Sequence, residues 1–522
     1  MKKKIIFIII ILILGIFLLG CTEDNPDNNT SDQNGPPHNG PYCGDGECDS
    51  VEQTTGMCPE DCNGNEPTPP NDSNTTYNNS PFGILAGAGS FSQISEFITN
   101  MGVRSIRYGG IQGVDWNQIE YRMGPNYPEE FQGWGNTDKW YKDTYDAGIE
   151  MSVIITTNEN PTLSETRLNE YAEFVRQAVE RYDGDGIDDA PGSPIVTYWE
   201  IDNEPDILPQ YEAFFFWKGD MDLVDDYALM LKTAYKAVKS ANPNAKVAIG
   251  ALGTRIEYHR AVLEELEKLK DSQTDQFFDV FNFHVYGDLR SYGRDAYVQE
   301  GAPDSITMTM VNELLAEYGY SGIETIVTES GTQTGNGTGQ TQSDQAISLL
   351  KRYVYLISEG LDRLYWFNLL NVIGEPTDID IDGFPSHTLI RYDSENNTDH
   401  QKRLGYYTYK LMTEKLEGSD WDNASEIYNN DNVYAYKFTN KSDGSVIYVA
   451  WWDYYKDPSY SDGDTKEITL SELGFSGNVT VTDTIPKYVS GTEVIDYSSA
   501  FNTWTTSELI DFGKTPVYIE QN

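Results

Sequence analysis

The chain has 522 residues and carries 83 acidic side chains against 36 lysines and arginines, which gives a formal net charge of −47 at pH 7. A surface this acidic repels phosphate groups, so the composition argues against nucleic acid as a partner and disfavours polyanionic glycans. The length is enough for two or three domains, each with a hydrophobic core of its own.

The N-terminus, residues 1–21, resembles an export signal. Lysines at positions 2 to 4 precede the apolar run "IIFIIIILILGIFLLGC", an order that is typical of secretion signals. The ending "LLGC" resembles the lipobox of bacterial-type lipoproteins, which implies that Cys21 becomes the lipidated first residue. The alternative is an uncleaved membrane helix. With either anchor, we expect the chain on the extracellular face of the cell membrane.

A cysteine cluster follows at residues 43–62, and it holds Cys43, Cys48, Cys58 and Cys62. An exported chain meets oxidising conditions, so four clustered cysteines predict two disulfide bonds, for which three pairings exist. A zinc site is the alternative. The flanking segments 22–42 and 63–80 are rich in Asn, Asp and Pro and almost lack apolar residues, so they are expected to be disordered linkers.

From residue 82 onward, short apolar runs alternate with helical patterns. The predicted strands are 82–87, 103–110, 150–157, 195–201, 246–252, 278–286, 324–330 and 363–370, and a predicted helix follows each of them. Strands that alternate with helices of this length pair in parallel. Eight such units predict an α/β fold, a (β/α)₈ TIM barrel over residues 81–418. A doubly wound open sheet is the alternative, but no glycine-rich phosphate loop follows the first strand.

The helical pattern ends near residue 418, and residues 419–522 contain short β-type runs between Gly, Asp, Asn and Pro. This pattern predicts a small antiparallel β-sandwich domain after the barrel. Trp451 and Trp452 are adjacent in one of its strands, so their side chains point to opposite faces and at least one belongs to the core. We therefore expect a structural role for this domain.

The fourth strand ends in a concentration of acids, in the sequence "YWEIDNEP". Pro205 cannot donate a ladder hydrogen bond, so the strand stops there and Glu204 lies at its C-terminal end. The seventh strand, "ETIVTES", ends with Glu329. Because barrel enzymes build their sites at the C-terminal ends of the strands, we expect both glutamates at the mouth. Glu200 and Asp202 precede this rim.

An Asn-Glu-Pro that ends strand four, a glutamate at the end of strand seven and "FHVY" on strand six together resemble the clan A retaining glycoside hydrolases. The resemblance covers residues 81–522 and is nearest to the β-xylosidase and iduronidase-like family, although cellulase-type families share these features. It implies that Glu204 is the acid/base, that Glu329 is the nucleophile and that Asn203 binds the 2-hydroxyl of the substrate. It also implies that no cofactor is required.

Further side chains on the same strands are candidates for substrate binding. Arg107, on strand two, can keep Glu329 ionised through a charge-assisted hydrogen bond, or else form a salt bridge inside the barrel. His284 and Tyr286 alternate along strand six and therefore face the same side. Trp366 on strand eight has a ring that can stack on a sugar, with core packing as the alternative.

Before the fourth strand, "YDGDGIDDAPGSP" places Asp183, Asp185 and Asp189 in a glycine-rich loop. Alternating carboxylates on a flexible segment are typical of calcium loops, although the spacing of an EF-hand is absent. The loop precedes the strand, so it lies at the opposite end of the barrel from the predicted catalytic site. A structural calcium ion and a plain solvated turn are the two interpretations.

The sequence therefore predicts a monomeric, surface-tethered glycoside hydrolase that cleaves O-glycosidic bonds of an oligosaccharide or polysaccharide by double displacement. It uses carboxylates and no catalytic metal. The alternative is a non-catalytic glycan-binding surface protein that kept the barrel. The pair Glu204 and Glu329 favours the enzyme, because a binding module does not need both acids.

Overall fold

The computed structural model covers the predicted barrel and the C-terminal domain, whereas the predicted signal and the cysteine cluster lie outside the described residues. The structure describes residues 79–87, 91–122, 133–157, 164–206, 223–251, 253, 256–286, 306–334, 341–370, 387–391, 401–454, 457, 459–461, 463–487 and 496–521. None of the helices in these ranges is long and apolar enough to cross a membrane.

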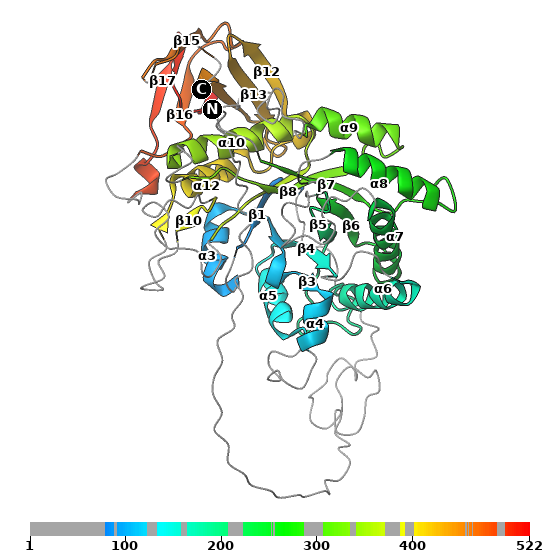
Figure 1. Cartoon of the computed structure of the whole chain (residues 1–522). Coiled ribbons are helices and arrows are strands. Elements are labelled where there is room, and N and C mark those ends of the chain that lie inside the picture. Colours follow the sequence, from blue (N-terminus) through cyan, green and yellow to red (C-terminus); the bar gives the residue numbers. More distant parts are fainter. Residues whose placement is uncertain are drawn as a thin grey trace, which may run out of the picture. The chain divides into compact units, whose positions relative to one another are not determined.

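Eight parallel strands close into a barrel (Figure 1). They are β1 (Phe82–Leu85), β2 (Ser105–Tyr108), β4 (Glu150–Thr156), β5 (Tyr198–Asn203), β6 (Lys246–Ala251), β7 (Val280–Val285), β8 (Glu324–Ser330) and β9 (Arg363–Trp366). Each pairs with the next of these strands, and β9 pairs with β1, which closes the sheet. This closure confirms the predicted barrel and excludes the open sheet, whose outer strands do not meet. A short additional strand, β3 (Val114–Asp115), pairs with the end of β4.

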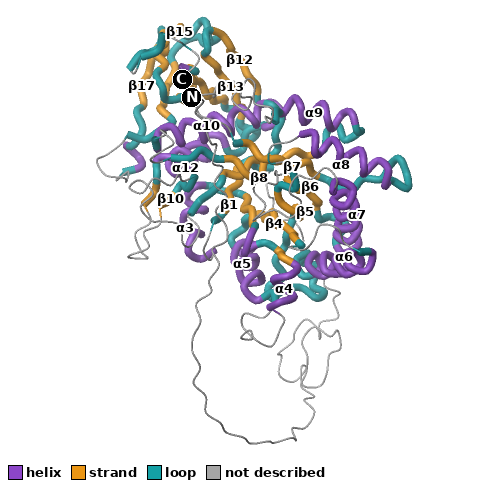
Figure 2. The backbone as a smooth tube through the Cα atoms, viewed as in Figure 1, coloured by secondary structure: helices purple, strands orange, loops and turns teal. Residues whose placement is uncertain are grey.

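Helices surround these strands (Figure 2). In chain order, the helices that follow the barrel strands are α3 (Phe91–Met101), α5 (Gly135–Asp146), α6 (Glu165–Glu180), α7 (Val224–Ala241), α8 (Ile256–Leu269), α9 (Met308–Glu317), α10 (Gln342–Ser358) and α12 (Leu404–Leu416). Local signals set their starts, since Ser164 caps α6 and Thr341 caps α10 in a capping box with Asp344.

Several short elements complete the barrel region. The sequence pattern does not predict α4 (Trp116–Arg122), which lies between β2 and α5. Two short strands, β10 (Ile390–Arg391) and β11 (Gln401–Lys402), pair with each other before α12. A single 3₁₀ turn lies at Gly110–Gln112, and two more lie in the C-terminal domain, at Trp421–Asn423 and Tyr497–Ser499.

The alternation of side chains along each strand decides which residues enter the barrel. One set forms a small buried cluster of its own: Tyr198, Ala248, Val280 and Ile326. Their strand neighbours pack in the large core shared with the helices: Trp199, Val247, Phe281 and Val327. Because successive side chains point to opposite faces, the first set marks the barrel interior. The same parity places Glu200, His284 and Thr328 inside.

The C-terminal domain is an antiparallel β-sandwich, as predicted. Its larger sheet has the strand order β12 (Ser425–Asn430), β13 (Val433–Thr439), β14 (Val446–Trp452), β19 (Val517–Gln521), β16 (Val479–Asp483) and β17 (Thr503–Thr506). The smaller sheet pairs β15 (Lys466–Thr469) with β18 (Leu509–Phe512). The sequence does not predict β12, β17 or β18. The first two are largely exposed, so they lack the apolar alternation that marks a half-buried strand.

Both tryptophans of β14 are buried, on opposite faces of the sheet. Trp451 is 2% exposed, joins the core that includes the barrel helices and stacks on Tyr436 at a centroid distance of 4.9 Å. Trp452 is 3% exposed and belongs to the core of the sandwich itself. The prediction that at least one of them is core is confirmed. The Lys351 ammonium of α10 lies 5.6 Å from the Trp451 ring, so this side chain helps to join the sandwich to the barrel.

We expect Trp451→Ala to lower the free energy of unfolding by about 3–5 kcal/mol, because the truncation leaves a cavity in a core that both domains share. Trp504→Ala is the matched control. Trp504 lies in the same domain but is 36% exposed, so its loss should change the free energy of unfolding by about 0.5 kcal/mol or less. Denaturant unfolding followed by circular dichroism measures both values, and equal effects would contradict the packing described here.

Candidate active site

Three titratable side chains meet at the C-terminal ends of β5, β7 and β8. They are Glu204, His284 and Glu329, and one side-chain oxygen or nitrogen of each lies within 4.8 Å of those of the others. Glu204 is 8% and His284 is 2% exposed. The structure therefore brings together the two glutamates that the sequence placed at the mouth, although they lie far apart along the chain.

The backbone at the end of β5 is turned by two left-handed residues. Asp202 has a φ of 68° and Glu204 a φ of 47°, a conformation that costs a non-glycine residue about 1–3 kcal/mol. The turn at Asp202 breaks the alternation of the strand, so Asn203 reaches the Arg107 guanidinium inside the barrel. Asp202 lies on the helix side, where its charge adds to burial in raising the pKa of Tyr171. The strain therefore presents Asn203 and Glu204 to the mouth.

The other acids of this stretch have partners of their own. Glu200 is fully buried inside the barrel and pairs with Arg107. Asp206 is also fully buried and accepts a hydrogen bond from the backbone N–H of Gly253 at 2.7 Å. Glu204 is thus the acid of the stretch that directly faces the second glutamate.

A β-bulge redirects the end of β8. Val327 pairs with Phe283 on β7. The next pair in the register joins His284 to Glu329, so Thr328 is an extra residue on β8. Thr328 already faces the interior, and strict alternation would turn the next side chain outward. The bulge allows both neighbours to face inward, which is how Glu329 reaches the mouth.

Arg107 on β2 holds three of the side chains at the mouth. Its Nη1 donates to Glu329 Oε1 at 2.6 Å, and its Nη2 donates to Asn203 Oδ1 at 2.7 Å. Its Nε and Nη2 donate to the two oxygens of Glu200 at 2.9 and 2.8 Å. The contact to Glu329 that the sequence suggested is present, and so is the alternative, a salt bridge inside the barrel. The sequence analysis missed the part played by Glu200.

His284 lies close to both glutamates, since its Nδ1 is also 3.8 Å from Glu329 Oε2, whereas Tyr286 contacts Glu329 alone. His284 Nδ1 lies 2.6 Å from Glu204 Oε1, and its Nε2 lies 3.1 Å from Thr328 Oγ1. The Tyr286 hydroxyl donates to Glu329 Oε2 at 2.7 Å. His284 is buried, so the structure favours a role in holding Glu204 over the direct substrate contact that the sequence suggested. Tyr286 is 39% exposed and is open to a substrate as well.

The two glutamates have opposite electrostatic environments. Burial raises the pKa of Glu204, and this effect outweighs the opposing influence of His284. Burial acts in the same direction on Glu329, but the charges of His284 and Arg107 outweigh it and lower the pKa of this carboxyl group. Against the effect of burial, the two carboxylates raise the pKa of His284. The site can therefore hold one protonated and one ionised carboxyl group, the combination that acid catalysis with nucleophilic attack requires.

Trp366 does not line the mouth. It is fully buried in the core and donates its Nε1–H to the backbone carbonyl of His387 at 3.2 Å. A buried ring has no free face for a sugar, so the structure favours core packing over the stacking role that we expected. The reason is the alternation along β9. The Tyr365 hydroxyl lies 2.7 Å from Ser105 Oγ, inside the barrel, so Trp366 points outward.

Phe367 is the aromatic residue of this strand end that the sequence analysis missed. Its ring centroid lies 6.3 Å from that of Tyr286 and 5.5 Å from that of His387. The rings of Tyr286 and His387 are 5.6 Å apart, and Tyr286 bonds Glu329, so the three rings form one cluster beside this glutamate. The sequence signal that could have found Phe367 is the alternation of side chains along the strand, because Phe367 lies two residues after the inward-facing Tyr365.

The acidic loop before β5 brings its carboxylates together. Asp183, Asp185 and Asp189 each place one oxygen within 4.8 Å of the others. Burial, and then the charges of its two neighbours, raise the pKa of Asp183 to about 7. Backbone N–H groups of the loop also donate to these carboxylates, as in a self-contained turn. The arrangement fits both interpretations of the loop, and the calcium ion stays a prediction.

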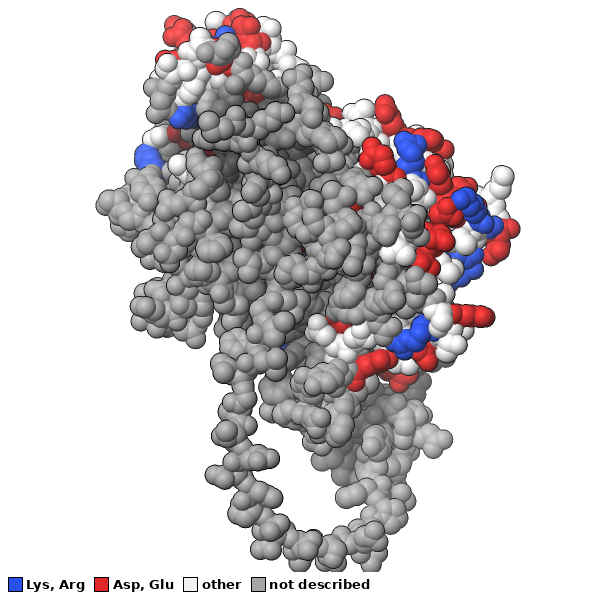
Figure 3. Space-filling model, in the orientation of Figure 1, with Lys and Arg blue, Asp and Glu red and all other residues white. Residues whose placement is uncertain are grey.

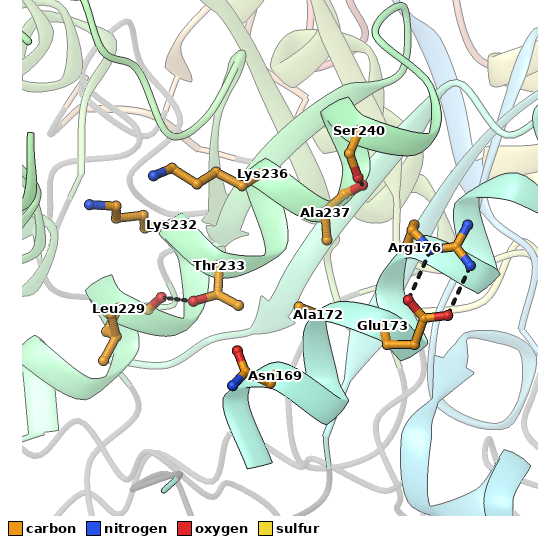
Figure 4. Close-up of a pocket in the computed structure, with 10 residues that line it drawn as sticks. All are labelled: Asn169, Ala172, Glu173, Arg176, Leu229, Lys232, Thr233, Lys236, Ala237 and Ser240. Carbon is orange, nitrogen blue, oxygen red and sulfur yellow. Dashed lines mark hydrogen bonds and ion pairs between the residues drawn. The ribbon is translucent and has the colours of Figure 1, made fainter. Parts of the chain in front are cut away.

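A groove of about 490 Å³ lies between α6 and α7, on the outer layer of helices (Figure 4). Its walls are formed by Asn169, Ala172, Glu173, Arg176, Leu229, Lys232, Thr233, Lys236, Ala237 and Ser240. Charged groups in it already have partners, because Arg176 bonds Glu173 and Lys232 donates to the carbonyl of Leu269. The residues that line it include no pair of facing acids, so the mouth of the barrel remains the candidate site.

On the face that Figure 3 shows, the coloured part of the surface mixes the two signs of charge, with acidic groups in excess. Ion pairs such as those of Arg260 with Glu317 and Lys268 with Glu265 lie on α8 and α9. Within the part coloured in Figure 3, basic side chains are interspersed among acidic ones. Such a surface keeps a protein soluble and does not attract polyanions.

Comparison with known proteins agrees with this geometry. Residues 111–369 match the family model "Cellulase (glycosyl hydrolase family 5)". No curated protein matches the chain in sequence. The family model is of the cellulase type, and the predicted proximity to the β-xylosidase and iduronidase-like family stays a prediction.

Solved structures share the fold at low sequence identity. A glucosidase from Croceicoccus marinus is 14% identical, with a TM-score of 0.53 over 85% of this chain and 96% of that chain. An α-L-arabinofuranosidase from Thermotoga maritima is 13% identical, with a TM-score of 0.56 over 84% and 96%. A monomeric β-xylosidase from Caulobacter crescentus CB15 is 15% identical, with a TM-score of 0.53 over 84% and 96%.

The family match spans the barrel from the loop after β2 to the end of β9, and it includes both glutamates. The fold, the strand ends that carry Glu204 and Glu329 and the match to a glycosidase family all agree. The chain is therefore an enzyme, a glycoside hydrolase.

Proposed function

We propose that the chain is a retaining O-glycosidase in which Glu204 is the acid/base and Glu329 the nucleophile. The observation that carries this proposal is the spacing of the two carboxyl groups, which place oxygens within 4.8 Å of each other. Retaining enzymes hold the two groups about 5–5.5 Å apart, whereas inverting enzymes leave about 6.5–9.5 Å for a water molecule. The raised pKa of Glu204 and the lowered pKa of Glu329 support the same roles.

In the first half of the reaction, the glycosidic bond lies between the two carboxyl groups. Glu204 gives its proton to the leaving oxygen while a Glu329 oxygen forms a bond to the anomeric carbon. Arg107 and Tyr286 each donate a hydrogen bond to Glu329 and so orient it for attack. His284 holds Glu204 on the other side.

In the second half, water hydrolyses the sugar ester on Glu329. Glu204, now ionised, takes a proton from the water, whose oxygen bonds to the anomeric carbon and releases Glu329. Two inversions give net retention of configuration. Arg107 occupies the amide oxygen of Asn203, so the NH₂ group of this amide is the part that donates to the 2-hydroxyl of the sugar.

As substrate we propose a neutral oligosaccharide or polysaccharide. The net charge of −47 disfavours polyanionic glycans. The fold neighbours described as a glucosidase, an arabinofuranosidase and a xylosidase act on neutral sugars, in line with this choice. The rings of Phe367 and Tyr286 offer apolar surface beside the nucleophile, against which the carbon face of a sugar can pack.

The alternative from the sequence, a non-catalytic glycan-binding protein, is disfavoured by the match to a glycosidase family. It shares the barrel and the ring cluster, but it does not require two glutamates with opposite pKa shifts. A panel of aryl glycosides and polysaccharides separates the two functions, because a binding protein retains affinity without turnover.

Tethering to the extracellular face of the membrane is a proposal that rests on the sequence alone. The apolar run that ends at Cys21 supports it, and the cysteine cluster agrees with export to an oxidising compartment, where two disulfides form. The predicted linkers on both sides of the cluster would then act as spacers between the membrane and the barrel.

Cys21→Ser is expected to move the chain from the membrane fraction to the soluble fraction, because it removes the atom that carries the lipid. Cys43→Ser is the control, since it leaves Cys21 in place and should stay with the membrane. Cell fractionation with immunodetection measures the distribution. A Cys21→Ser chain that stays in the membrane fraction would point to the uncleaved helix.

The two glutamates should fail in different ways. Glu329→Ala removes the group that forms the glycosyl-enzyme, so kcat should fall by on the order of 10⁴-fold or more for every substrate. Glu204→Ala removes the proton donor, worth about 10²–10⁴-fold, and this matters least for an aryl glycoside with an acidic leaving group. Glu257→Ala, an exposed acid on α8, should keep wild-type activity.

Azide separates the two roles further, since it can replace either missing group. In Glu329→Ala it should restore cleavage and give a glycosyl azide of inverted configuration. In Glu204→Ala it should attack the glycosyl-enzyme and give an azide of retained configuration. NMR of the products reads the configuration. If the two variants exchange these outcomes, the roles are reversed.

The pH profile of kcat/KM should be bell-shaped. The nucleophile must be ionised, so activity is lost as the pH falls through the lowered pKa of Glu329, below the value of an ordinary glutamate. The acid must be protonated, so activity is lost as the pH rises through the raised pKa of Glu204. Because the two groups interact, the apparent pKa values read from the two limbs belong to the pair of glutamates and not to either one alone. Steady-state kinetics across pH tests this, and an acidic limb above the pKa of an ordinary glutamate, or the absence of an alkaline limb, would contradict the assignment.

A further inference from the structure

Glu200 is a carboxylate in the floor of the site that the proposed reaction does not use. It faces the barrel interior from β5 and has no exposed surface. Both of its oxygens accept hydrogen bonds from one guanidinium, from Arg107 Nε at 2.9 Å and from Nη2 at 2.8 Å. The Thr328 hydroxyl lies 3.4 Å from Oε1 of the same carboxylate. A carboxylate buried this completely and bound in two-point fashion fixes its partner in one orientation.

The orientation of Arg107 decides the geometry of the mouth. One edge of the guanidinium is held by Glu200, so the remaining donors point in set directions. Nη1 meets Glu329 at 2.6 Å, and Nη2 also meets Asn203 at 2.7 Å. The proposed nucleophile and the proposed 2-hydroxyl ligand are therefore both positioned by an arginine that Glu200 orients.

Glu200 also balances the charge of this arginine. Without the negative charge of Glu200, the positive charge of Arg107 would act at full strength on the two catalytic carboxyl groups. Interactions between charges are strong in a buried site. The titratable groups around these carboxyl groups are Arg107 from β2, to which Glu200 is bonded, Asp206 after β5, His284 and Tyr286 from the β7 stretch, and His387 before β10. Within this set, Glu200 is the acid bonded directly to the arginine.

We propose that Glu200 is a positioning residue that aims Arg107 at Glu329 and, through its negative charge, sets the pH range in which the enzyme works. The proposal rests on the function proposed above. It assigns two separable contributions to Glu200, one of geometry and one of charge.

Two substitutions in the full chain separate these contributions. Glu200→Gln keeps the length of the side chain but removes its charge. The loss of a nearby negative charge favours the ionised form of both catalytic glutamates, so both limbs of the kcat/KM profile should move to lower pH, by about one pH unit. Glu200→Asp keeps the charge but shortens the reach, so kcat should fall at least tenfold while the limbs stay within about 0.3 pH units of the wild-type positions.

The profiles are measured with one aryl glycoside, and circular dichroism confirms that each variant is folded. If Glu200→Gln does not fold, the same change is made in an Arg107→Gln background, where no unpaired cation is left buried. In that background too, Glu200→Gln should move the limbs to lower pH. Limbs that coincide with and without the Glu200 charge would overturn the proposal, and so would an equal shift in Glu200→Asp.

A second readout does not require turnover. Titration of ¹³C-labelled glutamate carboxyl groups by NMR, with Glu204→Gln and Glu329→Gln for assignment, follows the same two protonation steps. If the wild-type chain cleaves no glycoside but the two protonation steps still move to lower pH in Glu200→Gln, the proposed function is overturned and the charge effect of Glu200 stands. An active wild type whose two steps do not move in Glu200→Gln would overturn the inference alone.

Discussion

The guanidinium of Arg107 contacts side chains from two other strands, and each of these contacts depends on the closed barrel. β2 supplies the arginine, β5 supplies Glu200 and Asn203, and β8 supplies Glu329. β2, β5 and β8 are not hydrogen-bonded neighbours in the sheet. They face one another only because β9 returns to β1 and all eight strands point in the same direction. The charge network of the mouth is therefore a consequence of barrel closure.

Regular strands alone would not produce this mouth. On β5, left-handed backbone at Asp202 brings Asn203 to the interior, and on β8 the extra residue Thr328 lets Glu329 follow it inward. Both irregularities occur at the C-terminal end of a strand, where the ladder is about to stop. The regular parts of the same strands pack the core, and they hold the irregular ends in place at a cost that the rest of the fold offsets.

The electrostatic asymmetry of the two glutamates follows from which neighbours they meet. Burial raises the pKa of Glu329, but the charges of His284 and Arg107 and the hydrogen bonds from Tyr286 and Arg107 outweigh it, so the pKa is lowered. Glu204 meets His284, and burial dominates, so its pKa is raised. One fold thus gives two carboxyl groups opposite protonation states by distributing donors unequally between them. The surrounding acids have their own partners, which keeps them from competing for these roles.

The sequence by itself determined the barrel, the sandwich and the two glutamates at strand ends, because alternating strand and helix patterns and the Asn-Glu-Pro stop are local signals. It also indicated Arg107 as a partner of Glu329. Only the tertiary structure decided that His284 holds Glu204, that Glu200 holds Arg107 and that the ring at the mouth belongs to Phe367 and not to Trp366. These outcomes depend on register, on a bulge and on left-handed residues, and a shift of one residue along a strand exchanges its two faces. Such a shift leaves no trace in a single sequence, because it is fixed by contacts between strands that lie far apart along the chain.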